Sequence, residues 1–338
     1  METSMSRKLF ALSLTATLMG GAAYAETPQV AVDIAPVHSL VARVMDGIGK
    51  PDLIIQPGAS PHEYSLRPSE ASALQAADLV FWIGPDLTPW LTDTIGTLAS
   101  DAVVTELMEA DGTIELEFRE GALFEAHDHD DHGVDDDHDN HGDDDDHDDH
   151  GDDDDHDEAE SGHEGHDHGA HDPHAWLSPK NAMNWLNVIA GQLSAVDPDN
   201  AGAYFANAAA GRTEIKTLIG EVTATLDPVR GGQFIVFHDA YQYFEMDFDF
   251  PASGAISISD ASDPSPARIA KIQARIAEQG IDCVLAEPQF NPGLVATVLD
   301  GTDAQTGILD PLGSDLELGP AFYPQLIRNL SNVLADCM

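Results

Sequence analysis

Residues 197–228 read DPDNAGAYFANAAAGRTEIKTLIGEVTATLDP. Asp197-Pro198 is a typical helix start and Asp227-Pro228 a typical end, so we expect one long helix over residues 198–227. The apolar side chains between them recur at helical spacing. They are Tyr204, Phe205, Ala208, Ile215, Leu218, Ile219 and Val222. A single helix of this length would connect the parts of the chain on either side of it stiffly.

The chain before this helix alternates between strand and helix patterns. Short apolar runs that predict strands occupy residues 30–34, 53–55, 79–83 and 102–105. Helical patterns occupy residues 37–45, 68–77 and 89–98, and another helix is expected from Pro179 to Ala195 after the N-cap Ser178. This order predicts a parallel sheet covered by helices.

The chain after the long helix repeats the alternation. Strands are expected at residues 234–237, 255–258, 282–286 and 306–309, and helices at 240–244, 266–279, 292–299 and 322–335. The predicted fold class is therefore α/β, with two lobes that each hold a mostly parallel sheet flanked by helices, joined by one long rigid helix. We place the N-terminal lobe at residues 26–197, the linking helix at 198–227 and the C-terminal lobe at 228–338.

The N-terminus has the pattern of a secretory signal peptide. Arg7 and Lys8 precede an apolar core from Leu9 to Leu18, and Ala23-Tyr24-Ala25 forms an A-x-A cleavage site. We expect residues 1–25 to be removed and the mature chain to be exported and soluble. No cysteine stands at the cleavage site to carry a lipid anchor, so the periplasm is the expected location.

An insertion at residues 126–172 is rich in histidine and aspartate and contains no Lys or Arg. Twelve of the 16 histidines lie in it: His127, His129, His132, His138, His141, His147, His150, His156, His163, His166, His168 and His171. The segment is too polar to offset its ordering entropy, so we expect it to be disordered without a ligand. An acidic solubilising linker does not need a histidine every few residues, and we therefore interpret the tract as a set of weak auxiliary metal sites.

The net charge limits the classes of partner. The chain of 338 residues carries 61 Asp and Glu against 14 Lys and Arg, a formal charge of −47. Repulsion excludes nucleic acid and anionic membranes as partners. Cations are the ligands that such a field attracts.

Four histidines lie outside the tract, and three of them are expected in loops that follow strands or precede a helix. These are His62, His174 and His238, and Asp310 directly follows the last expected strand. Such loops line the ligand crevice of parallel sheets. Three imidazoles with a carboxylate or water make a tetrahedral zinc site, which would lie in the cleft between the lobes. We expect the fourth histidine, His38, to be structural or to support a ligand.

Cys283 and Cys337 are the two cysteines of the chain. In an oxidising compartment a disulfide is the expected state, and it would tie the C-terminal helix to the core. The alternative is a thiolate pair on a metal, but neither cysteine has a neighbouring ligand in the sequence.

Several motifs together resemble those of ZnuA-type zinc-binding proteins of bacterial ABC importers. They are SPHEYSLRPSE (60–70), ADLVFWIGPDL (77–87), HAWLSP (174–179), FHDAYQYFE (237–245), CVLAEPQF (283–290) and LDPLG (309–313). The resemblance covers nearly all of the mature chain and implies two α/β lobes bridged by a long helix. It also implies a disulfide between Cys283 and Cys337.

The resemblance implies a ligand set as well. The three histidine ligands of the family fall on His62, His174 and His238, and an aspartate near its site falls on Asp310. Pro61 stands where some zinc-binding members have a glutamate, which leaves Asp310 or water as the fourth ligand. Manganese-binding members have a glutamate in place of the third histidine, so His238 favours zinc. Many members carry a His/Asp-rich loop before the second ligand, as this chain does.

We therefore expect a periplasmic protein without enzymatic activity. It would capture Zn²⁺ and deliver it to an ABC permease with an ATPase subunit in the inner membrane, and we expect it to be a monomer. The tract would harvest zinc, sense sufficiency or recruit a periplasmic zinc metallochaperone. Three alternatives stay open: manganese or iron uptake, a periplasmic zinc buffer, and a zinc hydrolase with Glu63 or Asp239 as its base.

Overall fold

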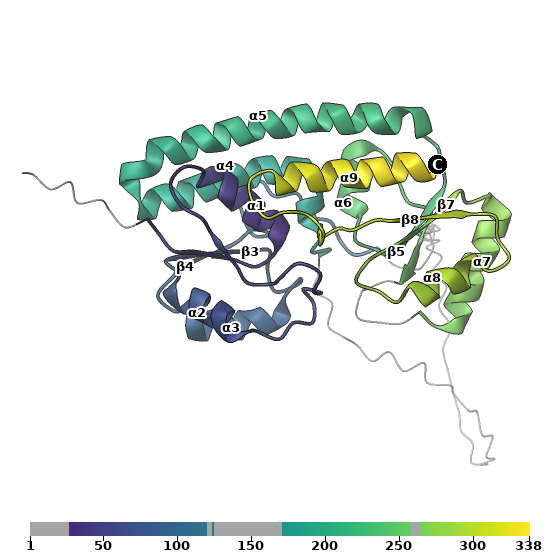
Figure 1. Cartoon of the computed structure of the whole chain (residues 1–338), viewed down its shortest axis with the longest axis horizontal. Helices are drawn as coiled ribbons and strands as arrows, with labels where there is room; N and C mark the ends of the chain where they lie inside the picture. Colours follow the sequence, from purple (N-terminus) through teal and green to yellow (C-terminus); the bar gives the residue numbers. More distant parts are fainter. Residues whose placement is uncertain (1–26, 120–123, 125–170, 258–263) are drawn as a thin grey trace, which may run out of the picture.

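A computed structural model describes residues 27–119, 124, 171–257 and 264–338 (Figure 1). The expected signal peptide and most of the His/Asp-rich tract lie outside the described residues. The described chain folds into two α/β lobes that share a layer of long helices, which confirms the predicted fold class. None of the helices in the described part combines the length and hydropathy needed to cross a membrane.

The first lobe is built on a four-stranded parallel sheet. Its strands are β1 (Val30–Val32), β2 (Asp52–Leu53), β3 (Leu79–Trp82) and β4 (Val103–Glu106), in the order β2-β1-β3-β4. The connecting helices are α1 (Ala35–Val44), α2 (Pro68–Ala76) and α3 (Pro89–Leu98). Figure 1 shows α2 and α3 on one face of this sheet and α1 on the other. β1 and β3 are buried throughout, as expected for central strands covered on both faces.

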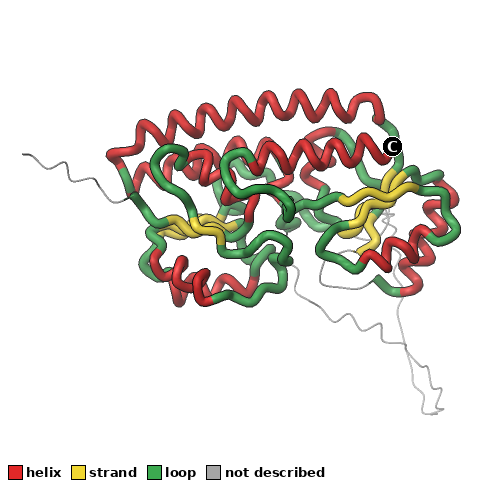
Figure 2. Tube along the Cα trace, in the orientation of Figure 1, coloured by secondary structure: helices red, strands yellow, loops and turns green. Residues whose placement is uncertain are grey.

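The second lobe repeats this topology. Its strands are β5 (Phe234–His238), β6 (Ala255–Ser257), β7 (Cys283–Ala286) and β8 (Gln305–Ile308), in the order β6-β5-β7-β8, again all parallel. Its helices are α6 (Gln242–Phe248), α7 (Pro266–Gln279) and α8 (Pro292–Leu299). The two sheets lie apart in the molecule, with α7 and α8 on the face of the second sheet away from the long helices (Figures 1 and 2).

Three helices form the layer that both lobes share. They are α4 (Pro179–Val196), α5 (Ala201–Leu226) and α9 (Phe322–Cys337). The predicted linking helix is α5, preceded by a short 3-10 turn over Pro198–Asn200, and it runs the length of the molecule (Figure 1).

The C-terminal helix α9 also reaches both lobes, which the sequence did not predict. At its start, the backbone N–H of Tyr323 donates to the hydroxyl of Ser39 in α1 at 2.9 Å. At its end, Cys337 forms a disulfide with Cys283 in β7, with a Cα–Cα distance of 5.8 Å. This confirms the expected disulfide, and it makes α9 a second connection beside α5.

The core is continuous across the lobes. One hydrophobic cluster contains buried residues of both sheets together with those of the long helices, from Val30 in β1 to Leu334 in α9. A smaller cluster, which includes Ile235 and Ile272, lies between the second sheet and its outer helices. Because the lobes share one core, separating them as rigid bodies would expose a large apolar area.

Candidate metal centre

Two histidines from distant parts of the chain face one another where the lobes meet. His238 is the last residue of β5, and His174 is the N-cap of a 3-10 turn over Ala175–Leu177 that leads into α4. Their Nε2 atoms lie 3.3 Å apart, and both side chains are buried. The strand and the turn thus present two imidazole nitrogens to one point.

A carboxylate lies against the other nitrogen of each ring. An oxygen of Asp172 lies 2.7 Å from Nδ1 of His174, and an oxygen of Glu287 lies 2.8 Å from Nδ1 of His238. The same two oxygens accept the backbone N–H groups of these histidines. A proton held on each Nδ1 leaves both Nε2 lone pairs directed toward the space between the rings. This is the arrangement of histidines that ligate metals in proteins.

Burial affects the titration of both carboxyl groups. It raises the pKa of Asp172 to about 7, partly opposed by the hydrogen bond from the backbone of His174. Burial also raises the pKa of Glu287, against the favourable charge and hydrogen bond of His238. A cation in this region favours the ionised form of both groups, since an opposite charge lowers a carboxyl pKa.

His62 lies beside this pair of histidines. It follows β2 in a loop and is half-buried, with its ring centroid 5.7 Å from that of His174. The loop is held against the first lobe by a hydrogen bond of 2.8 Å from the indole of Trp90 to the carbonyl of Pro61. The structure therefore brings together the three histidines that the sequence predicted as ligands.

The three histidines line a cavity of about 20 Å³. Such a volume holds one water molecule or one ion but no organic ligand. The remaining lining residues come from both lobes: Ser60, Pro61, Trp176, Glu287, Gln289, Phe290, Pro311 and Leu312. Within the described ranges, no three His, Cys, Asp or Glu side chains already surround one point at coordinating distance. Binding an ion therefore needs a small movement of these side chains.

Asp310 is not brought into this cavity. One carboxylate oxygen accepts from the side chain of Gln289 at 3.1 Å and the other accepts from both the backbone and the hydroxyl of Ser314 at 2.6 Å. The carboxylate thus organises its own loop, while its neighbours Pro311 and Leu312 line the cavity. His38 is also outside the cavity: it lies in α1 with Nε2 3.1 Å from the carbonyl of Pro51, and burial lowers its pKa.

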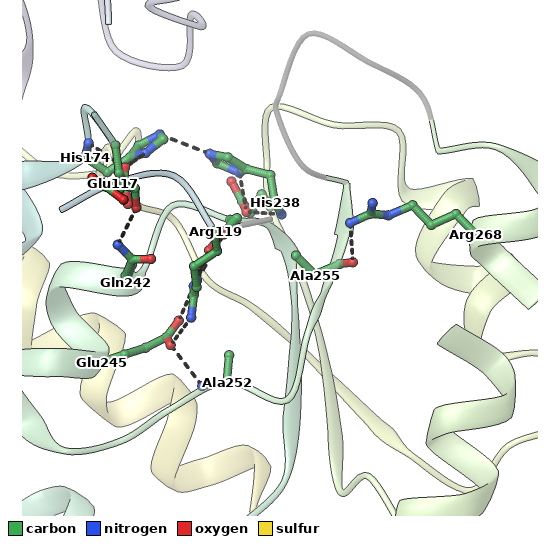
Figure 3. Close-up of polar contacts among 12 residues, drawn as sticks. Glu117, Arg119, His174, His238, Gln242, Glu245, Ala252, Ala255 and Arg268 are labelled. Atoms are coloured by element: carbon green, nitrogen blue, oxygen red, sulfur yellow. Dashed lines mark hydrogen bonds and ion pairs between the residues drawn. The ribbon is translucent and has the colours of Figure 1, made fainter. Parts of the chain in front are cut away.

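An arginine in the segment before the His/Asp-rich tract contacts the second lobe. The guanidinium of Arg119 donates to both Asp239 and Glu245 (Figure 3). Burial alone would lower the pKa of Arg119, but the hydrogen bonds to Glu245 and Asp239 raise it overall. Glu63 and Asp239, the two candidate bases of a zinc hydrolase, do not line the cavity. Asp239 is paired with Arg119, and Glu63 is exposed to solvent.

The chain just before the tract lies beside the end of the tract, close in sequence to His174. Glu117 and His171 form an isolated antiparallel bridge, and the N–H of Asp172 donates to the carbonyl of Leu116 at 2.8 Å. Of the twelve tract histidines only His171 is among the described residues; it is half-buried, 3.8 Å from a carboxylate oxygen of Glu115. The end of the tract and the segment before it are therefore paired two to three residues from His174.

Comparison with known proteins identifies the family of this chain. The model of a family described as ZnuA, zinc-uptake complex component A periplasmic, matches residues 30–337. The chain belongs to this family. It is 48% identical over 328 residues to the high-affinity zinc uptake system protein ZnuA of Brucella abortus (strain 2308), covering 97% of each chain. It is 44% identical over 317 residues to the protein of the same name from Paracoccus denitrificans (strain Pd 1222), covering 94% of this chain and 93% of that one.

A solved structure described as the crystal structure of ZnuA has the same fold. It superposes with a TM-score of 0.70 and 20% sequence identity, over 92% of this chain and 99% of the other. At this identity the likeness establishes the two-lobed architecture of the family and not the ligands.

Sequence reasoning missed the two carboxylates that support the histidines. Asp172 was available from the local pattern, because it stands two residues before His174 in HDPHAW. Glu287 was available from topology, because it directly follows β7, the strand next to the one that ends at His238. Either position points to a supporting carboxylate only if His174 and His238 are already taken as the candidate ligands.

Proposed function

We propose that this protein captures a single Zn²⁺ in the periplasm with His62, His174 and His238 and delivers it to the permease of an ABC importer. The observation that carries the proposal is the pair of Nε2 atoms at 3.3 Å, each ring backed by a carboxylate on Nδ1. Three imidazoles suit zinc better than manganese, which prefers oxygen ligands. Membership of a zinc-uptake family and two relatives named for zinc uptake support the same metal.

We assign the fourth coordination position to water. Asp310 is the alternative, but its carboxylate already accepts hydrogen bonds from Gln289, Leu312 and Ser314. Turning it toward the histidines would leave several of these donors without their acceptor, at roughly 1 kcal/mol or more for each. A water ligand requires no such rearrangement.

Capture and release then depend on loops more than on a hinge between the lobes. Both α5 and α9 run along the two lobes, and one core is shared between them. Large lobe separation would disrupt this core. The loops that carry His62 and Pro311 line the cavity, and we propose that the permease opens the site by moving them.

The tract supplies auxiliary sites of lower affinity. Each metal bound there must offset the entropy of ordering its ligands, whereas the three histidines of the centre are already held by folded loops. Because the end of the tract pairs with the segment that precedes it, next to His174 in the chain, zinc held on the tract would be concentrated near the centre. Harvesting, sensing and metallochaperone recruitment are all compatible with this position.

The deciding experiment compares two triple alanine variants by metal analysis and zinc titration of the mature protein. One variant removes His62, His174 and His238; the control removes the same number of histidines from the tract, at His127, His129 and His132. We expect the tight site to be lost in the first variant and kept in the control. Survival of the tight site in the first variant would overturn the assignment.

A further inference from the structure

A second, larger cavity lies beside the metal centre on the second lobe. It has a volume of about 380 Å³ and runs between the end of β8, the loop that follows it and one side of α9. We refer to it as the β8–α9 groove. Its apolar lining includes Leu316, Leu330 and Val333. The volume is far too large for one ion and suits a few side chains of a polypeptide.

The groove borders a strand edge that is open for pairing. β8 is the outermost strand of its sheet. The N–H groups of Gln305 and Leu309 donate to carbonyls on the β7 side, at Asp282 and Ala286. Because backbone groups alternate in direction along a strand, those of Thr306 and Ile308 point away from β7. Ile308, which also lines the groove, is 64% exposed. An extended segment can therefore pair with this edge.

The charge of the groove selects the kind of segment. Asp310, Asp315 and Asp336 line it, and among the described residues that form its walls there is no Lys or Arg. The nearby Arg328 is directed to Glu221 on α5, at 2.8 Å. Apolar walls with three carboxylates favour an apolar side chain flanked by Lys or Arg.

One loop separates the groove from the metal centre. Asp310 and Gly313 line the groove, while Pro311 and Leu312 line the 20 Å³ cavity. The loop is fastened on the side of the centre by the indole of Trp176, which donates to the carbonyl of Pro311 at 2.9 Å. A segment seated in the groove thus contacts the reverse side of a wall of the metal cavity.

We propose that the β8–α9 groove docks an extended, basic and apolar segment of the importer's permease, and that this docking loosens the wall formed by Asp310–Gly313 so that zinc can leave. The inference rests on the proposed function, because it names the contact through which that function is completed. It places the docking surface on the second lobe next to the loop that closes the metal cavity.

The test uses the permease and ATPase complex of the same organism, reconstituted in lipid nanodiscs, and the zinc-loaded mature protein. The groove variant combines Asp315→Lys with Asp336→Lys. Both residues are exposed, and within the described part of the chain neither side chain forms a hydrogen bond. The control is Asp300→Lys with Asp303→Lys, which makes the same charge change at two exposed residues of the same lobe outside the groove. Stimulated ATP hydrolysis and the rate of zinc dissociation into a chelating dye are measured.

We expect the groove variant to need about tenfold more protein for half-maximal stimulation, and the control less than twofold more, with the zinc affinity of both unchanged. The complex should accelerate zinc dissociation from the parent and the control but not from the groove variant. Equal stimulation by the groove variant and the parent would overturn the docking surface, as would a loss of zinc affinity in the groove variant. A parent protein that binds no zinc or fails to stimulate the complex would refute the proposed function, and the docking surface with it.

Discussion

Glu287 accepts a hydrogen bond of 2.8 Å from Nδ1 of His238, a residue 49 positions earlier in the chain, across the neighbouring strands β5 and β7. This contact fixes both the orientation and the protonated nitrogen of His238. We predict that Glu287→Gln weakens zinc binding roughly 10- to 100-fold, because the charge that supports the ligand is lost while the side chain keeps its size. Zinc titration in competition with a chelator measures the change.

The matched control for this prediction is Glu278→Gln, which makes the same substitution at an exposed position of α7. Its zinc affinity should equal that of the parent. The thermal unfolding of the metal-free Glu287→Gln variant should show that the fold is retained. Unchanged zinc affinity in this variant would mean that His238 needs no carboxylate partner or does not ligate zinc.

The positions of the strands and their parallel direction could be predicted from the sequence, but the way the lobes join could not. Apolar runs and capped helices located β1 to β8 to within a few residues, because their local patterns are strong. The position of α9 depends on contacts between residues such as Ser39 and Tyr323, which are 284 positions apart. An amphipathic pattern indicates that a helix buries one face, and it does not indicate against which lobe.

The proximity of the three histidines was predictable to a similar degree. The three histidines stand out because each follows a strand or precedes a capped helix, and the resemblance to a family placed all of them. The use of the Asp310 carboxylate within its own loop depends on the backbone turn at Leu312 and Ser314, which no spacing rule specifies. The position of a residue after a strand therefore predicts its neighbourhood and not the direction of its side chain.

We expect the fold to persist without the tract, because the segment before the tract pairs with its last residues. Glu117 and His171 pair, and Phe124 packs against the guanidinium of Arg119 at 3.6 Å. We predict that replacing residues 125–170 by a short Gly-Ser linker leaves one tight zinc site and lowers the number of zinc ions bound per chain. Isothermal titration calorimetry of both proteins gives the two stoichiometries.

A linker of the same length as the tract, with its histidines changed to serine, separates the effect of the ligands from that of the chain. It should match the short-linker variant in stoichiometry. Loss of the tight site in either variant would favour the zinc-buffer alternative. A parent that binds only one zinc ion would contradict a metal-binding role for the tract.

The disulfide between Cys283 and Cys337 closes a loop of 54 residues and holds the end of α9 on β7. We predict that changing both cysteines to alanine lowers the free energy of unfolding by about 4 kcal/mol, mainly because the unfolded chain gains conformational freedom. Urea unfolding followed by tryptophan fluorescence measures this value. Zinc affinity should stay within about twofold of the parent, since neither cysteine lines the metal cavity; a larger loss would show that the position of α9 controls the site.

Asp33 is a buried carboxyl group that we expect to make the stability of the protein depend on pH. It lies between β1 and α1, is 1% exposed, and accepts backbone N–H groups from Ile34 and Ile83, each at 2.7 Å. Burial raises its pKa to about 7, against the lowering effect of these hydrogen bonds. The folded state therefore retains a proton that the unfolded state releases near pH 4. Protonated Asp33 therefore contributes its full stabilisation of the folded state below pH 4, and this contribution is lost as the pH rises through 7.

We predict from this sign that Asp33→Asn, which cannot titrate, changes the pH profile and not only the stability at one pH. Between pH 4.5 and pH 8, the free energy of unfolding of the parent should fall by about 3 kcal/mol relative to that of the variant. Any constant difference in stability caused by the amide does not affect this change. Urea unfolding of the zinc-free proteins at several pH values measures the slope. Asp101→Asn, at an exposed aspartate of the same lobe, is the control and should keep the slope of the parent. Parallel profiles for Asp33→Asn and the parent would show that Asp33 is ionised in the folded state throughout this range.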